Sequence, residues 1–213
     1  MDKIKLASLE AGLERDNNFY GAQIGVVNEV EKGEVYGAQV AAVLNIAEKA
    51  KGAQISSVNL TDKIYGAQIG LILNGTEKGM YGAQVGTVMN IAGTAKGAQI
   101  GLANGAQETR GAQVGGLNIA SETMYGVQVG GLNFAKEAKG VQAGLVDIVI
   151  EADRVVQVGG ICVIASNPWY AKCLPFLNYG GNKVKRDRRK RLRAELLKRE
   201  REELERDKLG VRV

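Results

Sequence analysis

The sequence has no histidine among its 213 residues, and it has only two cysteines and two prolines. General acid–base chemistry near neutral pH most often uses histidine, so the familiar catalytic triads cannot be assembled from this chain. Two cysteines without histidine are too few for a disulfide framework or a metal site. These absences favour a protein that is not an enzyme and that holds no metal and no cofactor.

Aromatic residues are also scarce, at 5% of the chain, whereas glycine occurs 29 times. A rounded core depends on the large area that aromatic side chains bury, so Ala, Val and Ile must fill this interior, which favours thin, closely stacked layers. No run approaches the ~20 apolar residues of a membrane helix, and Met1–Leu6 lacks the apolar stretch of a signal peptide. The sequence as it stands therefore predicts a cytoplasmic protein.

What the chain does contain is a short repeat. Glutamine recurs ten times at intervals of 14 to 16 residues, and nine of the ten follow Gly-Ala or Gly-Val. An asparagine trails each of the first eight by five or six residues, and Asp147 and Cys162 take its place in the last two units. The glutamines are Gln23, Gln39, Gln54, Gln68, Gln84, Gln99, Gln113, Gln128, Gln142 and Gln157. The asparagines are Asn28, Asn45, Asn59, Asn74, Asn90, Asn104, Asn118 and Asn133.

Apolar residues flank both amides, as Ala22 and Ile24 flank Gln23. Alternation with a period of two is typical of a half-buried strand. Because apolar side chains usually face a core, we expect Ala22 and Ile24 to point inward. Gln and Asn are then expected to point outward, as two ladders on the surface.

The spacing within each unit varies. Ile24 and Val27 are three residues apart, whereas Val40 and Leu44 are four apart, and a shift of one residue reverses the face that a side chain occupies. A corner in the glycine-rich segment between the two arms removes this conflict, and a second corner falls in the charged stretches between units. Two arms and two corners in about fifteen residues describe one coil of a solenoid.

The predicted fold class is an all-β parallel β-solenoid of about ten coils of ~15 residues, with identical side chains stacked at ~4.8 Å per coil. The alternative is an antiparallel β-meander or a closed barrel, in which β-bulges at the glycines would also reverse the side-chain faces. Short repeats usually form stacked units, which favours the solenoid.

The segments Gly66–Asn74 (GAQIGLILN) and Gly111–Ala120 (GAQVGGLNIA) resemble the repeats of bacterial surface-repeat proteins of the spirochaete type, and the segment Pro168–Asn178 is similar to the way such arrays end. The resemblance covers roughly residues 20–180. The family has no established activity, and its members are typically secreted or envelope proteins. It therefore implies a cell-envelope location as the alternative to the cytoplasm.

Both ends of a solenoid expose strand edges that must be covered. We expect Trp169, Tyr170 and Phe176, which lie beside the two prolines of the chain, to plug the last coil. The predicted domains are an N-terminal cap (1–19), a β-repeat domain (20–165), a C-terminal cap with a hinge (166–182) and a charged helical tail (183–213).

The tail contains 14 Lys/Arg and 7 Asp/Glu, a net charge of +7, whereas residues 1–182 contain 14 and 16, a net charge of −2. From Lys183 to Leu209 there is neither Gly nor Pro, which favours a helix. Its basic half is either a site for nucleic acid or an acidic membrane surface, or a solvated helix face. The candidate anion-binding residues are Lys185, Arg186, Arg188, Arg189, Lys190, Arg191 and Arg193.

Three functions are consistent with this sequence. The first is a non-enzymatic structural or interaction scaffold that self-associates or binds a protein partner through its β-ladder faces, its ends and its tail. The second is a binder of nucleic acid or of an anionic surface through residues 183–193. The third is a membrane-inserted β-barrel, which would need an outward apolar band. None of the three predicts a small-molecule substrate.

Overall fold

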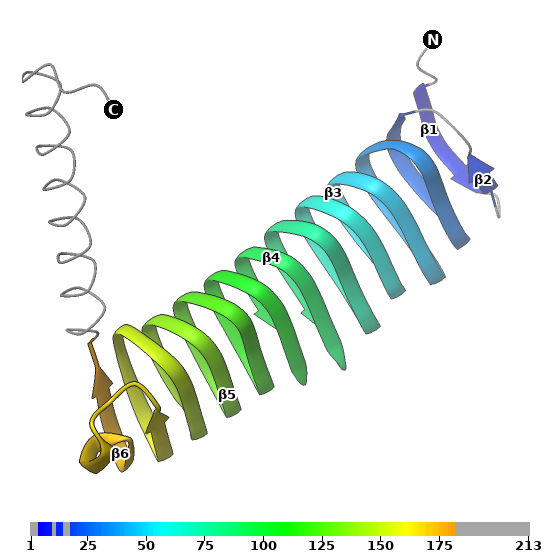
Figure 1. Ribbon diagram of the computed structural model, residues 1–213. Coiled ribbons are helices and arrows are strands. Elements are labelled where there is room, and N and C mark those ends of the chain that lie inside the picture. The colour runs from blue at the N-terminus through cyan, green and yellow to red at the C-terminus, as the bar shows by residue number, and fades with distance from the viewer. Residues whose placement is uncertain (1–3, 10–11, 15–17, 182–213) are drawn as a thin grey trace, which may run out of the picture. The chain divides into compact units, whose positions relative to one another are not determined.

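A computed structural model of the chain describes residues 4–9, 12–14 and 18–181. The elements, in chain order, are β1 (Ile4–Leu9), β2 (Gly12–Glu14), β3 (Phe19–Gly86), β4 (Met89–Ile100), β5 (Ala103–Ile164), the 3-10 helix η1 (Trp169–Ala171) and β6 (Cys173–Gly180). β3 and β5 are stretches of extended chain that wind through several successive coils, as Figure 1 shows.

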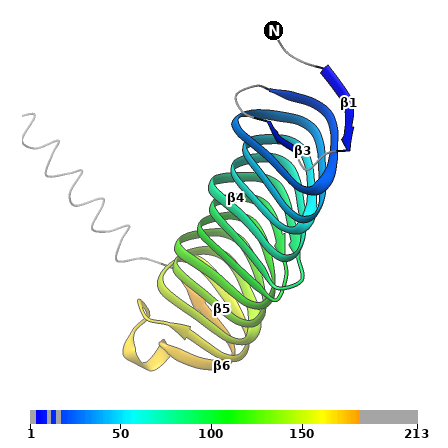
Figure 2. The same cartoon turned by 90° about the vertical axis from the view of Figure 1, so that its right-hand side faces the viewer.

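Neighbouring coils run in the same direction and lie in register. Gln99 of β4 pairs with Gln84 of β3 on one side and with Gln113 of β5 on the other, and both pairings are parallel. Viewed from the side, successive coils repeat the same path (Figure 2). The predicted all-β parallel β-solenoid with coils of about 15 residues is therefore confirmed, and the antiparallel meander or barrel is wrong.

The first corner of the coil lies between the glutamine and the asparagine. The chain bends at Thr87 and Val88, between β3 and β4, and one coil later at Gly101 and Leu102. The bends stack on each other, since the backbone N–H of Leu102 donates to the carbonyl oxygen of Thr87 at 3.2 Å. The bend absorbs the extra residue of the longer units, because it carries no strict alternation.

The second corner depends on a column of glycines, each two residues before a glutamine. Their φ angles lie between +118° and +144°, a backbone conformation that other residues rarely adopt. A Cβ atom on Gly97 would lie 1.9 Å from the carbonyl oxygen of Gly82, one coil earlier. The chain therefore needs glycine at this turn in the first nine coils, whereas the last coil has Val155 at this position. The column comprises Gly21, Gly37, Gly52, Gly66, Gly82, Gly97, Gly111, Gly126 and Gly140.

The interior beside the second corner is apolar and narrow. Buried alanines, such as Ala95 and Ala138, alternate along the stack with the larger Met80 and Met124. Small side chains predominate because the two walls of each coil lie close together, and this explains why so few aromatic residues are needed.

The N-terminal end of the stack is covered by strands. β1 and β2 pair in parallel with the start of β3, so that Ser8 lies opposite Gln23 and Gly12 lies opposite Asn28. Residues 4–9 and 12–14 thus add a partial coil of the same kind to the first full coil.

The C-terminal end is covered by β6, which pairs antiparallel with the end of β5 and places Asn178 opposite Gln157. The prediction that aromatic side chains plug the last coil is wrong, because Trp169 is 85% exposed and Tyr170 and Phe176 are also mostly exposed. Hydrogen bonds from the reversed strand satisfy the last edge instead. The predicted helical tail, 183–213, lies outside the described residues.

Candidate functional site

The ten glutamines of the repeat form one continuous ladder inside the solenoid. The Nε2 atom of each donates to the Oε1 atom of the glutamine one coil earlier, at 2.6–3.0 Å, from Gln157 back to Gln23. Several donate a second N–H to a backbone carbonyl across the interior, as Gln99 does to Gly105 at 3.3 Å. A carbonyl only accepts, so this contact fixes which way these amides face, and the ladder carries the same orientation to the others.

The eight asparagines form a second ladder, in which the donors point the other way. From Asn28 to Asn118, each Nδ2 donates to the Oδ1 of the asparagine one coil later, at 2.8–3.0 Å. It also donates to a backbone carbonyl of that coil, as Asn90 does to Ile100 at 2.8 Å. Because the two ladders donate in opposite directions, their dipoles largely cancel along the axis.

The residue two positions after the glutamine makes room for the asparagine amide. It is glycine in most coils, and a Cβ atom on Gly70 would lie 2.5 Å from the Oδ1 of Asn74. At Gly101 a Cβ atom would lie 2.7 Å from the Nδ2 of Asn90. The Gly-x-Gln-x-Gly pattern therefore provides one glycine for the second corner and one for the asparagine ladder.

The prediction that Gln and Asn point outward is wrong. All ten glutamines and all eight asparagines are buried, whereas flanking residues such as Ile55 and Ile100 are exposed. A buried amide is costly only when it is unpaired, and in a stack of identical coils each amide finds its partners in the coils above and below. The predicted association through β-ladder faces is wrong for the same reason, because these amides do not reach the surface.

The asparagine ladder ends in a carboxyl group. Asn133 donates to the Oδ1 of the buried Asp147 at 2.7 Å. The Oδ2 atom stands where an asparagine has its amide nitrogen, beside Gly159 of the last coil, and has no hydrogen-bond partner. Burial raises the pKa of Asp147, although hydrogen bonds from Asn133 and the Gly144 backbone act in the opposite direction. Protonated Asp147 has the shape of asparagine and can donate from Oδ2.

The tenth position of the asparagine column is the thiol of Cys162, which is buried and free. Burial raises the pKa of this thiol, and the neighbouring Asp147 acts in the same direction. Cys173, by contrast, is exposed on β6. The polar ladder therefore gives way to a carboxyl and then to a thiol at the C-terminal end.

The outward surface around the first corner is aliphatic. The corner residues lie three or four positions after the glutamine, and we call this set the aliphatic edge; Leu102 is 63% exposed and Leu145 is 72% exposed. The aliphatic edge comprises Val26, Val43, Leu71, Ile72, Val88, Leu102, Leu117, Leu132, Leu145 and Ile161. It is flanked by exposed residues directly after the glutamine, such as Ile69 and Val129.

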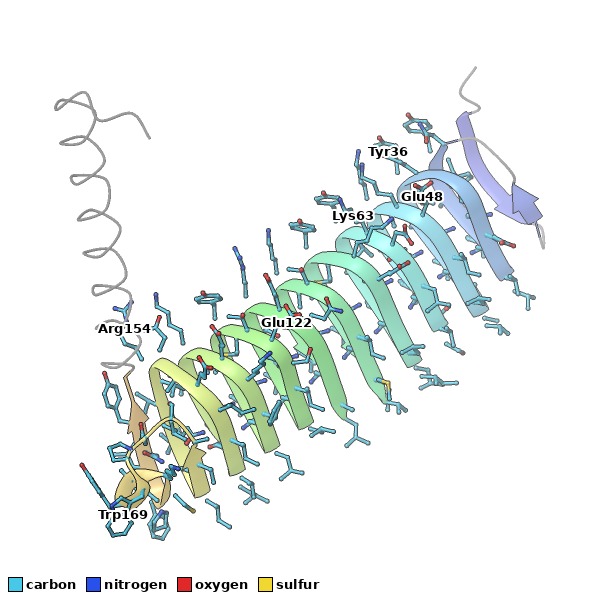
Figure 3. All side chains as sticks on the ribbon, in the orientation of Figure 1. Tyr36, Glu48, Lys63, Glu122, Arg154 and Trp169 are labelled. Atoms are coloured by element: carbon cyan, nitrogen blue, oxygen red, sulfur yellow. The ribbon has the colours of Figure 1, made fainter. Side chains whose placement is uncertain are left out.

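The opposite long side of the solenoid, which we call the charged edge, carries aromatic and ionic side chains. Figure 3 shows Tyr36, Glu48, Lys63, Glu122 and Arg154 along it, whereas the side chains along the other long side are almost entirely carbon. The residue three positions before each glutamine is always Tyr, Lys or Arg. This column comprises Tyr20, Tyr36, Lys51, Tyr65, Tyr81, Lys96, Arg110, Tyr125, Lys139 and Arg154.

Contacts between coils hold the charged edge together. Tyr20 stacks on Tyr36 with ring centroids 4.7 Å apart, and the Nζ of Lys51 lies 4.4 Å from the centroid of Tyr36. Glu34 accepts from Lys49 and from the Tyr36 hydroxyl, and pairs with Lys51 at 2.9 Å. Lys49, Tyr36 and Lys51 together lower the pKa of Glu34 to about 2. These aromatic and charged side chains thus contact one another within the charged edge.

A shallow, open groove of about 390 Å³ lies where Gly75 leaves a gap between Leu60 and Ile91. Asp62 and Glu77 also line it. Its wall consists mainly of aliphatic side chains. The groove lies on the arm of the coil that contains the asparagine, and its lining residues Leu60, Gly75 and Ile91 directly follow an asparagine.

No protein-family model, curated protein or solved structure matches this chain. The resemblance to the spirochaete surface-repeat proteins therefore stays a prediction, and what the structure shows is a β-solenoid with stacked Asn and Gln ladders. The candidate anion-binding residues, from Lys185 to Arg193, lie outside the described residues.

The part of the chain that the structure describes contains no group of three or more His, Cys, Asp or Glu side chains that could hold a metal ion. Within the same part, no helix is long and apolar enough to cross a membrane. Sequence reasoning missed the aliphatic edge, because it assigned the apolar residues of the arms to the interior. The sequence did contain a signal for it. The glutamine is the same in all ten units, as a buried ladder requires, whereas the next residue varies between Ile, Val and Ala, as an exposed position allows.

Proposed function

We propose that the chain is a non-enzymatic structural scaffold, a rigid spacer that associates with other macromolecules through its outer surface. The observation that carries this proposal is the continuity of the buried ladders, which join each coil to the next by side-chain hydrogen bonds in addition to backbone pairing. A spacer needs such coupling, because each unit of a repeat protein contacts only its neighbours.

The distribution of polar groups supports a structural role. Almost every inward polar side chain donates to or accepts from another coil, so that few remain for chemistry. Among the described residues, the buried polar side-chain atoms without a partner are Asn28 Oδ1, Thr109 Oγ1, Asp147 Oδ2 and Gln157 Oε1. The atoms of Asn28 and Gln157 are the open ends of the two ladders.

Rigidity can be measured with two spin labels on equivalent positions of different coils. Glu48 and Glu122 both follow their glutamine by nine residues, both are exposed, and five coil steps separate them. At ~4.8 Å per step, we expect about 24 Å between their backbones. The exposed Cys173 is replaced by serine in this variant, whereas Cys162 is buried and does not react with the label.

Pulsed electron–electron double resonance should give one narrow distance distribution for this pair of spin labels. A second pair at Glu48 and Glu108, four coil steps or about 19 Å apart on the same edge, reports the width that the labels themselves contribute. A distribution for the distant pair that is several times wider than that of the near pair would contradict the rigid spacer.

A further inference from the structure

We infer that the aliphatic edge is the interface through which two copies of this chain associate side by side. This inference rests on the proposed scaffold function and names its partner. It concerns the outward surface of the coils, which the ladders and the charged edge do not use.

The size of the surface is the first argument. The residues of the aliphatic edge are each more than a third exposed, and so are the aliphatic residues directly after eight of the ten glutamines, Val40 and Ala143 being less exposed. Together they expose on the order of 1,000 Å², whereas the apolar patch of a monomer is usually a few hundred Å² and a stable interface buries about 800 Å² per partner. The aliphatic edge therefore matches what a stable dimer needs.

The absence of charge is the second argument. Between the residue before each glutamine and the residue after each asparagine, the only ionisable acidic or basic side chains are Glu29, in the first coil, and the buried Asp147. Charged residues are depleted at the core of protein interfaces, because burying an unpaired charge is costly. Apart from Glu29, this strip can therefore be covered by a partner without burying an unpaired charge.

The relief of the edge is the third argument. At the third position after the glutamine, Leu71, Leu102 and Leu145 project, whereas Gly131 and Gly160, which have only backbone atoms beside them, leave recesses in the same column. A second copy has the same projections and recesses at the same spacing of ~4.8 Å per coil. A two-fold axis lets the projections of each copy enter the recesses of the other, as an isologous interface requires.

The charge of the body favours a second copy over a lipid surface. Residues 1–182 contain 14 Lys/Arg and 16 Asp/Glu, a net charge of −2. Binding to an anionic bilayer usually combines apolar insertion with flanking basic residues, whereas the basic residues of the solenoid do not flank the aliphatic edge and share the opposite edge with acidic ones.

The test compares two pairs of substitutions in the full chain. Leu102→Lys with Leu145→Lys places two charges on the aliphatic edge, at side chains that are exposed in the single copy. Gln107→Lys with Ser121→Lys places two charges at exposed positions between the asparagine and the next glutamine. Sedimentation equilibrium measures the mass of each protein at about 10 µM, where an interface of micromolar affinity or better is occupied. Circular dichroism checks that the β-structure is retained.

The parent chain and the Gln107/Ser121 variant are expected to sediment as dimers, and the Leu102/Leu145 variant as a monomer with a dissociation constant raised at least ~100-fold. A monomeric parent chain would overturn the inference and leave the rigid spacer intact. A dimer that survives Leu102→Lys with Leu145→Lys would also overturn it. So would phosphatidylcholine vesicles that bind the parent chain and dissociate its dimer, because the edge would then be a lipid-binding surface.

Discussion

Gln99 and Ile100 are neighbours in β4, yet Gln99 is fully buried and Ile100 is 45% exposed. An ordinary half-buried strand has the opposite arrangement, with the amide in water and the isoleucine in the core. The difference teaches that burial in a stack of identical units depends on whether a side chain can pair with itself one coil away. The glutamine amide can pair in this way. The isoleucine cannot, and in our proposal it is buried against a second copy of the chain instead.

The largest effect is expected where the backbone itself forms the contact between coils. Gly97→Ala puts a Cβ atom 1.9 Å from the carbonyl oxygen of Gly82 in a residue with φ of +138°, and neither atom can move aside. We expect a loss of about 4 kcal/mol or more in the free energy of unfolding, in the range of severe substitutions, measured by chemical denaturation.

The matched control for this substitution is Gly105→Ala. A Cβ atom on Gly105 meets nothing within 4 Å, so the change should stay within ~0.5 kcal/mol. Equal losses for Gly97→Ala and Gly105→Ala would show that the glycine column is not a steric requirement.

The next largest effect separates the two faces of β4. Gln99→Leu keeps a similar volume but leaves the Oε1 of Gln84 and the Nε2 of Gln113 without their ladder partner. Two unpaired buried groups should cost about 2–6 kcal/mol in the free energy of unfolding. Ile100→Thr, one residue away on the outer face, should cost less than ~1 kcal/mol in the monomeric Leu102/Leu145 variant.

A smaller effect is expected at the end of the asparagine ladder. Folding favours protonated Asp147 because burial raises its pKa, so this residue contributes stability below the pKa of the unfolded chain, ~3.9, and the contribution is lost as pH rises through the folded pKa. Asp147→Asn restores a donor at that position. We expect it to stabilise the chain by about 1–2 kcal/mol at pH 7 and much less at pH 3.

Thermal denaturation of the parent chain and the Asp147→Asn variant across this pH range measures the difference. The thiol of Cys162 is the other titratable group that faces Asp147, and Cys162→Ala in both backgrounds removes its contribution. A difference that does not change with pH would contradict a protonated carboxyl in the ladder.

The smallest effect is expected on the charged edge. Lys49, Tyr36 and Lys51 lower the pKa of Glu34 to about 2, so the carboxylate contributes stability above the pKa of an unfolded glutamate and loses it as pH falls toward 2. Glu34→Gln should lower the free energy of unfolding at pH 7 by less than ~1 kcal/mol, because the pair is partly exposed. A chloride titration that leaves the difference unchanged would argue against an ionic origin.

The period of the chain was readable from its sequence because identical residues recur at nearly constant spacing. The spacings between the two arms also predicted the first corner, which the structure places at bends such as Thr87–Val88. The stacking in register followed from the same repeat, since it brings Gln84, Gln99 and Gln113 together. These features depend on backbone geometry, which a period of two and its interruptions reveal.

The orientation of the arms was not readable from alternation. A period of two divides a strand into two faces without saying which one is interior, and the usual rule that apolar residues face inward gave the wrong answer for Ile24 and Gln23. That rule compares each side chain with water, whereas the ladders depend on pairing between coils. The covering of the C-terminal end was missed because β6 reverses direction, and nothing in the repeat specifies that reversal.

The central claim is that the side-chain amides of the repeat are buried in the ladders, whereas a glutamine outside the ladders is exposed to water. Hydrogen exchange of side-chain NH₂ groups, followed by NMR, tests it most directly, because Gln99 is buried in the ladder and Gln107 is exposed eight residues later. The account predicts that the Nε2 protons of Gln99 exchange at least ~100-fold more slowly than those of Gln107. Equal exchange rates for the two glutamines would contradict it.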